Sequence, residues 1–251
     1  MRAMEHPFGI DFGGTGIKGA PVDLAVGDFA EERVRHPTPQ PSTPEAVADV
    51  FVQLLASFPE SYSPVGVTVP GVVRRGVVGS AANIDDAWIG TDADAMLSDR
   101  LRRSVHVVND ADAAGLAEAA YGAARGVTGL VIVTTLGTGI GSAMVHDGVL
   151  VPNAELGHLE IDGHDAESRA ANSARKREEL SWEEWGARLT RYYRTVEMLF
   201  SPEVFVIGGG VSKDAEHWLP HVHVRTPIVT ATLLNRAGVV GAALLAAREQ
   251  D

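Results

Sequence analysis

The first residues able to do chemistry form a glycine-rich turn near the amino terminus. The segment Asp11-Phe12-Gly13-Gly14-Thr15-Gly16-Ile17-Lys18 directly follows an apolar stretch, residues 8–10. Glycines let backbone N–H groups approach an anion without interference from Cβ atoms, and the Thr15 hydroxyl adds a further donor. The carboxylate of Asp11 can hold a hydrated Mg²⁺ ion. The segment therefore predicts a phosphate-binding turn made by Asp11, Gly13, Gly14, Thr15 and Lys18.

A second copy of this turn lies near the middle of the chain. Gly14-Thr15-Gly16-Ile17 recurs as Gly137-Thr138-Gly139-Ile140, and each copy stands between two β-prone stretches. The pattern predicts a β-hairpin with a glycine turn, made twice, and fits neither a Walker loop nor a dinucleotide fingerprint. A plain tight hairpin without a ligand is the alternative, which the repetition disfavours. Thr135, Gly137, Thr138 and Gly139 belong to this second predicted turn.

An asparagine and an aspartate stand where a strand is predicted to run into a helix. Val107-Val108-Asn109-Asp110 precedes an alanine-rich segment. The helix dipole and the free N–H groups of the first turn keep an aspartate ionised at this place. An ionised Asp110 could accept a proton from an alcohol. An ordinary helix N-cap is the alternative, and the residue pattern alone favours the cap.

A carboxylate and an imidazole stand three residues apart in Glu155-Leu156-Gly157-His158. One Glu and one His without further ligands would make a weak metal site. Hydrogen bonding to neighbouring hydroxyl groups of a ligand suits the pair better, so we expect Glu155 and His158 to bind a polyol.

Three further histidines, His217, His221 and His223, also raise the question of a metal site. Pro220 interrupts helical spacing between them, and residues 221–224 alternate as in a strand. We therefore expect surface histidines on a strand in place of a metal site.

Strands and helices alternate around these motifs. Residues 65–71 and 204–210 are predicted strands that end in glycine, and each follows one of the two hairpins. Helices are predicted over 44–58, with Thr43 as cap, over 110–124, from Ser181 to about 199, and over 235–249. Ser181 and Glu184 form a capping box. The third helix has core-facing spacing at Trp182, Trp185, Leu189, Tyr192, Val196 and Leu199. Two related halves of this kind indicate a two-lobed α/β protein with a cleft between the lobes.

Composition excludes several classes of protein. The chain has 251 residues, 45% of them hydrophobic, and 21 basic against 33 acidic side chains, for a net charge of −12. Such a balance disfavours a general nucleic-acid or anionic-membrane binder. The absence of cysteine excludes disulfides, thiolate catalysis and cysteine-ligated zinc. No uncharged apolar run is long enough to suggest a membrane span or a secretion signal, so we expect a cytoplasmic protein.

The ordered set of motifs resembles one known family. The Asp11-to-Thr15 turn, Asn109-Asp110, the turn at 137–141, the motif at 155–158 and Gly208-Gly209-Gly210-Val211 follow one another as in the ROK group of sugar kinases. The resemblance spans roughly residues 8–247. It implies the two-lobed α/β fold of the actin/hexokinase/Hsp70 superfamily, which is ribonuclease H-like with duplicated halves. Residues 1–110 plus 235–251 would form the small lobe and 111–234 the larger one.

Finer features are similar to polyphosphate glucokinases within that group. They lie at residues 13–24, 38–41, 83–90 and 207–213. Most ROK kinases carry a cysteine-rich zinc loop after the Glu-x-Gly-His motif, whereas polyphosphate glucokinases are similar to this chain in lacking one. The resemblance therefore implies that no zinc is bound and that Glu167 corresponds to the glutamate ending that loop.

The resemblance also implies a role for each motif. Asp110 would be the general base that takes the proton from the sugar 6-hydroxyl. The residues expected to hold the remaining hydroxyls are Asn83, Asn109, Glu155, His158 and Glu167. The turns at 13–15 and 135–139 would bind the phosphates, with Mg²⁺ near Asp11. The residues corresponding to the nucleotide-contacting turn of ATP-using relatives are Gly208, Gly209, Gly210 and Lys213.

The expected activity is phosphorylation of glucose from polyphosphate, ATP or both, by a homodimer. Mannose is a second expected acceptor, since it differs from glucose at one hydroxyl. A sugar-sensing regulator of the same group is an alternative, disfavoured because the phosphate turn begins at residue 11 and leaves no room for a DNA-binding module. A filament-forming actin relative is disfavoured by the sugar-contact residues.

An acidic chain that binds a polyanion needs local positive charge. The cations are 18 Arg and only 3 Lys, and arginine suits phosphate oxygens better. We expect a basic groove on an otherwise acidic surface, and Lys18 and Lys213 each follow a glycine turn. The candidate arginines predicted to line the groove are Arg74, Arg75, Arg102, Arg103 and Arg225. The alternative is that most of them are ordinary solvated surface residues.

Overall fold

The structure is a computed structural model that describes residues 6–59 and 62–249. It divides into two compact units: unit 1 comprises Met1–Ala117 and Asn235–Asp251, and unit 2 comprises Glu118–Leu234. The sequence-based division lies after residue 110, which is the first residue of helix α3 (Asp110–Tyr121). The observed division falls inside that helix, so α3 contributes to both units.

Unit 1 is built on a six-stranded sheet. The strand order is β3-β2-β1-β5-β8, and β4 also pairs with β2. β1 and β2 are antiparallel, whereas β1, β5 and β8 run parallel to one another. The strands are β1 (Phe8–Gly13), β2 (Gly16–Asp23), β3 (Asp28–Phe29), β4 (Val34–Pro37), β5 (Val65–Val69) and β8 (Val105–Asn109). A small separate hairpin joins β6 (Val73–Arg74) and β7 (Val77–Val78).

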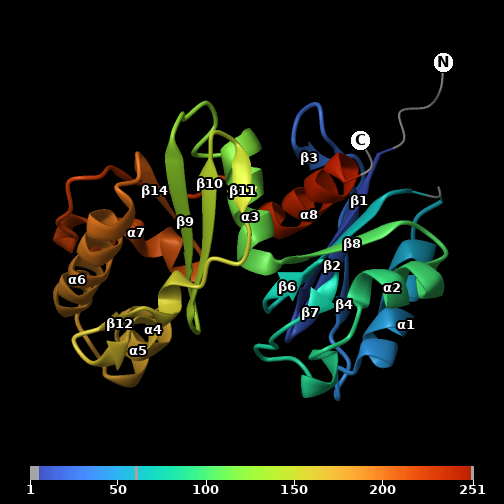
Figure 1. Cartoon of the computed structure of the whole chain (residues 1–251), viewed down its shortest axis with the longest axis horizontal. Helices are drawn as coiled ribbons and strands as arrows, with labels where there is room; N and C mark the ends of the chain where they lie inside the picture. Colours follow the sequence, from blue (N-terminus) through green and yellow to red (C-terminus); the bar gives the residue numbers. More distant parts are fainter. Residues whose placement is uncertain (1–5, 60–61, 250–251) are drawn as a thin grey trace. The chain divides into compact units, whose positions relative to one another are not determined.

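Helices cover both faces of this sheet. α1 (Pro44–Ala56) and α2 (Ala93–Leu101) lie on one face and α8 (Ala237–Arg248) on the other (Figure 1). All five residues of β5 are buried, as expected for a central parallel strand covered on both sides. Thr43 caps α1 and Pro44 is its first residue, as predicted, but the helix ends at Ala56, two residues before the predicted end.

Helix α8 lies unusually close to its neighbours because glycines replace side chains at the contacts. A Cβ atom on Gly9 or Gly66 would lie 1.9 Å from the carbonyl oxygen of Val239 or Ala242, respectively. A Cβ atom on Gly241 would lie 1.8 Å from the carbonyl oxygen of Ala113 in α3. The helix therefore packs backbone to backbone on β1, β5 and α3, which explains part of the glycine content of 27 among 251 residues.

Unit 2 repeats the sheet of unit 1. Its order is β11-β10-β9-β14-β15, and β9 is antiparallel to β10 but parallel to β14, which is parallel to β15. The strands are β9 (Leu130–Leu136), β10 (Ile140–His146), β11 (Val149–Val151), β14 (Val204–Gly208) and β15 (Ile228–Thr230). Position by position this matches β3-β2-β1-β5-β8, so the predicted α/β fold with duplicated halves is confirmed.

The helices of unit 2 follow the two hairpin strands. They are α4 (Ala166–Ala170), α5 (Asn172–Arg177), α6 (Trp182–Phe200) and α7 (Ala215–Trp218), with the short pair β12 (Glu160–Ile161) and β13 (His164–Asp165) before α4. The capping box of Ser181 and Glu184 is present. Trp185, Leu189, Tyr192 and Val196 are buried as expected, whereas Leu199 is 53% exposed, so its assignment to the core was wrong.

The predicted strand at residues 221–224 is wrong. His221 ends a short 3₁₀ helix (Leu219–His221), and the following residues are irregular. The backbone of this segment forms hydrogen bonds with a side chain of α6 and not with a neighbouring strand. The Thr190 hydroxyl donates to the carbonyl oxygen of His221 at 3.2 Å and accepts the N–H of His223 at 2.9 Å. Across residues 6–59 and 62–249, these histidines form no cluster spaced for a metal ion.

None of the helices in the described part of the chain is long and apolar enough to cross a membrane.

The close packing of α8 predicts a specific sensitivity to added volume. Gly66→Ala should lower the free energy of unfolding by about 1–3 kcal/mol, because the new methyl group meets the α8 backbone and not a flexible side chain. Urea denaturation measures this difference. Gly79→Ala is the matched control, since its Cβ would meet its nearest atoms at 3.6 Å. Equal stability of the two variants would contradict the packing described.

Candidate functional site

The first glycine turn joins β1 to β2 in unit 1. Gly14 and Thr15 form the turn, and neighbouring side chains bind its carbonyl groups. Thr38 Oγ1 donates to the Gly13 oxygen at 2.5 Å, and an Arg35 Nη donates to the Thr15 oxygen at 3.3 Å. Asn83 also lies against the turn, because a Cβ on Gly14 would be 2.6 Å from its carbonyl oxygen. The turn is thus fixed from outside by residues distant in sequence.

Asp11 lies on β1 just before this turn. Its two oxygens contact Lys18 Nζ and Thr68 Oγ1, each at 3.1 Å, and its side chain is 24% exposed. Lys18 is its cross-strand partner on β2. A Cβ on Gly238 of α8 would lie 3.1 Å from the Asp11 carboxyl carbon. A partly buried carboxylate with a single ammonium partner is therefore held at the base of the turn.

At the junction of β8 and α3, the side chains of Asn109 and Asp110 make different hydrogen bonds to the backbone of the helix. Asn109 Oδ1 accepts the N–H groups of Ala111 and Asp112 at 2.8 and 3.0 Å, and its amide nitrogen donates to the Gly71 oxygen at 3.0 Å. Asn109 is therefore the helix cap, and the assignment that the residue pattern favoured for Asp110 is wrong. The Asp110 side chain, in the first turn, is exposed. Its Oδ1 accepts the Ala111 N–H at 2.8 Å.

The three parallel strands of unit 1 bring these groups to one edge of the sheet. β1, β5 and β8 end at Gly13, Val69 and Asn109, and the register pairs Val69 with Asn109. Because the carboxyl ends of parallel strands meet at one edge, the turn and Asp110 lie on the same side of unit 1. Ligands of open α/β sheets bind at this edge.

The second glycine turn, between β9 and β10, is held by α4 and α5 of unit 2. Ser173 donates its N–H to the Gly137 oxygen at 3.1 Å and its hydroxyl to the Thr138 oxygen at 2.5 Å. Glu167 Oε2 accepts the Ile140 N–H at 2.9 Å, and a Cβ on Gly139 would lie 2.3 Å from that oxygen. Glu167 therefore lies directly on the turn, and a side chain at position 139 would displace its carboxylate.

His158 is joined to Glu167 through Asp165. His158 Nδ1 is 2.8 Å from Asp165 Oδ2, while Asp165 Oδ1 accepts the N–H groups of Glu167 and Ser168 at 3.1 and 3.4 Å. The hydrogen bond to Asp165 raises the pKa of His158, and the charges of Glu167 and Glu155 add to this effect. Burial raises the pKa of Glu155. Three of the residues predicted to bind a sugar thus share one electrostatic environment in unit 2.

Asp165 was missed by the sequence-based prediction. It precedes Glu167 as the cap of α4, a pattern visible in Asp165-Ala166-Glu167-Ser168, but its contact with His158 is not visible there. In the described part of the chain, one group of three brings its potential ligand atoms within 4.8 Å of one another: His158, Asp165 and Glu167. Hydrogen bonds within the protein account for this arrangement.

The late glycine turn lies beside the second hairpin turn. β14 ends at Gly208, and a Cβ on Gly209 (φ 82°) would lie 2.5 Å from the carbonyl oxygen of Leu136, the last residue of β9. The Ser212 hydroxyl donates to the Gly209 oxygen at 2.8 Å. Lys213 follows, exposed, in a 3₁₀ helix (Gly210–Asp214). The structure thus places residues 137–139 and 208–210 next to each other at one sheet edge of unit 2.

Comparison with known proteins matches the chain with one family. The model of the ROK family matches residues 7–168. Polyphosphate glucokinase of Mycobacterium leprae is 49% identical over 238 residues, covering 94% of this chain and 73% of that protein. The crystal structure of inorganic polyphosphate/ATP-glucomannokinase from Arthrobacter sp. strain KM is 59% identical with a TM-score of 0.90, covering 97% and 99% of the two chains. A ROK family glucokinase from Streptomyces griseus, in complex with glucose and AMPPNP, is 25% identical with a TM-score of 0.82 over 97% and 99%.

The pairing of His158 with Asp165 predicts a pH-dependent contribution to stability. Because the folded-state pKa of His158 is raised, its protonated form stabilises the fold below the ordinary histidine pKa. This contribution is lost as the pH rises through the raised pKa. Asp165→Asn should therefore lower the thermal midpoint more at about pH 5.5 than at about pH 8.5.

Titration of the His158 ring by NMR tests the same contact directly. The pKa of His158 should fall in Asp165→Asn and stay unchanged in the control Asp147→Asn, where the altered carboxylate lies beside His146. An unchanged pKa in Asp165→Asn would show that the pair does not form.

Proposed function

Because the chain belongs to the ROK family, we propose that it is a polyphosphate-dependent glucokinase, which transfers a phosphoryl group from inorganic polyphosphate to the 6-hydroxyl of glucose. The observation that carries this proposal is the identity of 49% and 59% with two polyphosphate-using sugar kinases over more than nine tenths of the chain. The α/β fold with duplicated halves is that of the ROK sugar kinases, the actin/hexokinase type.

Asp110 is proposed as the general base. Its carboxylate is exposed in the first turn of α3, where the dipole and the backbone N–H of Ala111 favour the ionised form. Asn109 supplies the helix cap, so the capping of α3 does not depend on Asp110. Asp110 would take the proton of the sugar 6-hydroxyl as its oxygen attacks the terminal phosphorus, and the shortened polyphosphate leaves with the electron pair of the broken bond.

The remaining sugar hydroxyls are proposed to bind Asn83, Asn109, Glu155, His158 and Glu167. The oxygen of Asn109 is used in the cap and one of its amide N–H groups is donated to Gly71, so the second N–H is what it can offer a hydroxyl. With Nδ1 held by Asp165, His158 presents Nε2 to a ligand. The carboxylates of Glu155 and Glu167 supply acceptors for hydroxyl protons. Burial raises the pKa of Glu155. Donors and acceptors of both kinds are what a polyol requires.

Two glycine turns are proposed to bind the phosphates. Phosphoryl transfer depends on positioning and charge neutralisation more than on covalent help, so backbone N–H groups, Lys18 and a metal ion suffice. The Asp11 carboxylate has one ammonium partner and is partly exposed, so it fits a role in holding Mg²⁺ through water. Bound Mg²⁺ would neutralise charge on the phosphate oxygens.

ATP is proposed as a second donor. The turn of Gly208, Gly209 and Gly210 is intact and lies beside the second hairpin turn, and Lys213 follows it. This is the region expected to contact a nucleotide in ATP-using relatives. Polyphosphate and ATP end in the same phosphoanhydride group, so both suit the same glycine turns.

Mannose as a second acceptor, a homodimer and a cytoplasmic location are further proposals. They rest on family membership and on the similarity to a glucomannokinase. Assays with mannose, light scattering of the purified protein and cell fractionation test them in turn.

Asp110→Asn tests the proposed chemistry. This variant should lower kcat for glucose 6-phosphate formation by about 10²–10⁴-fold, because the amide cannot accept the hydroxyl proton. Glucose affinity, measured by calorimetry, should change little, because the amide is isosteric with the carboxylate.

The matched control is Asp99→Asn, a carboxylate of the same unit that is 78% exposed and paired with Arg102. It should keep the activity of the wild type. A fully active Asp110→Asn enzyme would refute the assignment of the base.

A further inference from the structure

The arginines predicted to line a polyphosphate groove lie on several different elements. Arg74 and Arg75 lie at the turn of the β6–β7 hairpin, and Arg225 belongs to unit 2, where it pairs with Glu197. Arg102 pairs with Asp99, and Arg103 donates to the Tyr62 oxygen. Arg102, Arg103 and Arg225 therefore already have partners within their own units.

Basic side chains gather elsewhere in unit 1, next to the first glycine turn. Strand β4 pairs with β2 so that Arg35 lies directly opposite Lys18. Like charges at directly opposed positions destabilise a sheet. Lys18 is compensated by Asp11 at 3.1 Å, but Arg35 makes no ion pair with a carboxylate in the described part of the chain. This arrangement puts an uncompensated guanidinium on an acidic protein, as expected when an anionic ligand supplies the missing charge.

Arg35 reaches the turn itself because the opposing strand begins with glycine. Its Nη donates to the carbonyl oxygen of Thr15 at 3.3 Å. A Cβ on Gly16 would lie 2.7–3.0 Å from three atoms of the guanidinium. The planar group therefore lies over the Gly16 backbone, beside the residues proposed to bind the transferred phosphate. A guanidinium in this position can bind phosphate oxygens with two parallel N–H groups.

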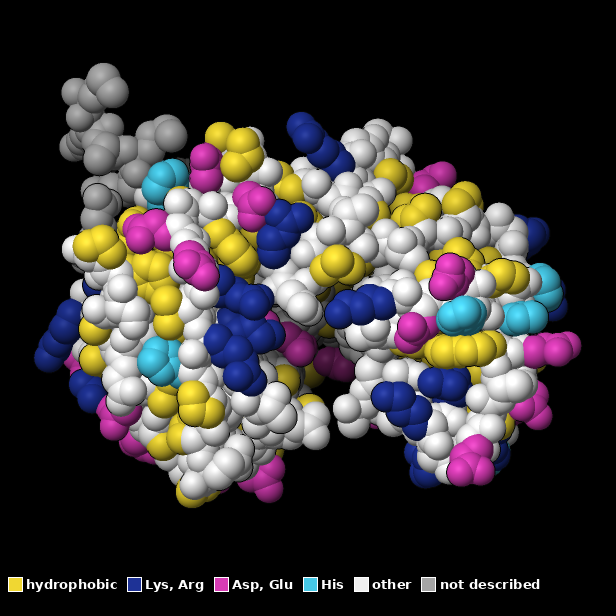
Figure 2. Space-filling view, turned by 180° about the vertical axis from the view of Figure 1, so that it is seen from behind, with side chains coloured by type: hydrophobic (Ala, Val, Ile, Leu, Met, Phe, Trp, Pro, Cys, Tyr) yellow, Lys and Arg dark blue, Asp and Glu magenta, His cyan; other side chains and the backbone are white. Residues whose placement is uncertain are grey.

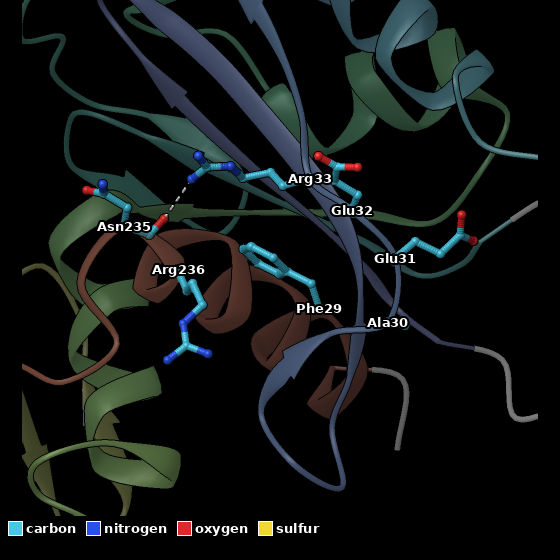
Figure 3. Close-up of a pocket in the computed structure, with 7 residues that line it drawn as sticks. All are labelled: Phe29, Ala30, Glu31, Glu32, Arg33, Asn235 and Arg236. Carbon is cyan, nitrogen blue, oxygen red and sulfur yellow. Dashed lines mark hydrogen bonds between the residues drawn. The ribbon is translucent and has the colours of Figure 1, made fainter.

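The basic residues continue past Arg35 into a pocket. Arg33 lies two residues before Arg35, which in extended chain is about 7 Å. The pocket, of about 660 Å³, is lined by Phe29, Ala30, Glu31, Glu32, Arg33, Asn235 and Arg236. Figure 3 shows that Arg33 extends toward Asn235, whose carbonyl oxygen accepts its N–H at 3.3 Å.

The charges of the pocket are divided between its two ends. Arg236 lies beside Asn235 and pairs with Asp28, while Glu31 points away toward the other end (Figure 3). Glu31 accepts the hydroxyl of Tyr62, and Glu32 is exposed. In the space-filling view, a group of dark blue side chains lies at the left, with magenta side chains near it (Figure 2). The Asn235 end of the pocket therefore carries the guanidinium groups of Arg33 and Arg236, the second of them paired with Asp28.

We propose that Arg35, Arg33 and Arg236 form a cationic row that binds the part of a linear polyphosphate that is not being transferred. The inference rests on the proposed function, which supplies the polyanion. Arg35 contacts phosphates close to the glycine turn, and Arg33 and Arg236 contact those further along the chain. A triphosphate reaches Arg35 alone, whereas a long polyphosphate also engages the pocket.

Donor kinetics at several chain lengths test this row. Arg35→Ala should raise the KM for long-chain polyphosphate by about tenfold or more, as loss of a charge-assisted hydrogen bond implies. Arg33→Ala should raise it for long chains but leave the KM for tripolyphosphate unchanged. Arg35→Lys should fall between the wild type and Arg35→Ala, because it keeps the charge and loses the paired N–H groups. The KM for glucose should stay constant throughout.

The control is Arg100→Ala, which removes an arginine that is 52% exposed, pairs with Asp49 and lies outside the row. It should leave the KM for polyphosphate unchanged. Equal KM values for long-chain polyphosphate in the wild type and in both alanine variants would overturn the row, while the glucokinase activity itself would stand.

Calorimetric titration with long-chain polyphosphate, without glucose, separates binding from catalysis. The wild type should bind it at least several-fold more tightly than Arg35→Ala at the same salt concentration, and added salt should reduce the difference. Equal affinities would refute the row even if no phosphoryl transfer were observed. Absence of glucose 6-phosphate in the wild type would refute the proposed function instead. Matching circular dichroism spectra exclude misfolding as the cause of any loss.

Discussion

The backbone contacts of helix α8 are the constraint on which the arrangement of unit 1 depends. Gly9, Gly66 and Gly241 allow this helix to touch β1, β5 and α3 without intervening side chains. β1 leads into the first glycine turn, and α3 begins at Asp110. One helix therefore fixes both the phosphate turn and the proposed base, and its own Gly238 lies against Asp11. Close packing of this kind leaves little room for adjustment, which suits groups that must be positioned accurately.

The charged side chains around the candidate site are governed by their immediate partners more than by the net charge of the protein. The net charge of −12 would oppose the approach of a polyanion, but opposite charges are distributed around particular groups. Lys18 is neutralised by Asp11, His158 is bound to Asp165, and Arg35 has a carbonyl oxygen as its partner at the turn. The first two pairs hold side chains in place. The third leaves a positive charge beside the turn proposed to bind phosphate.

Local patterns in the sequence predicted much of the fold. The repeated Gly-Thr-Gly turn indicated the duplicated hairpins, and the capping box at Ser181 marked the start of α6. These features depend on neighbouring residues and on φ values that glycine tolerates, so they are visible in a short window. The order of motifs along the chain then identified the residues of the candidate site.

Features set by tertiary contacts were not predictable in this way. The pairing of His158 with Asp165 and the place of Arg35 opposite Lys18 depend on strand register and on the approach of distant segments. Asn109 caps α3, and its side chain is oriented for this by the hydrogen bond from its amide nitrogen to the carbonyl oxygen of Gly71. The segment after His221 is held by Thr190 of α6 and not by a strand, although its residues alternate. In each case, a side chain interacts with a backbone group or a charged group that is not its neighbour in the sequence.

Phosphorus NMR of the wild-type protein with Mg²⁺, glucose and polyphosphate is the most direct test of the central claim. Signal should move from the polyphosphate chain to glucose 6-phosphate, without an equivalent release of inorganic phosphate, because the acceptor is the sugar hydroxyl and not water. Conversion of polyphosphate to inorganic phosphate alone, or no change in the spectrum with either polyphosphate or ATP as donor, would contradict the assignment of this chain as a glucokinase.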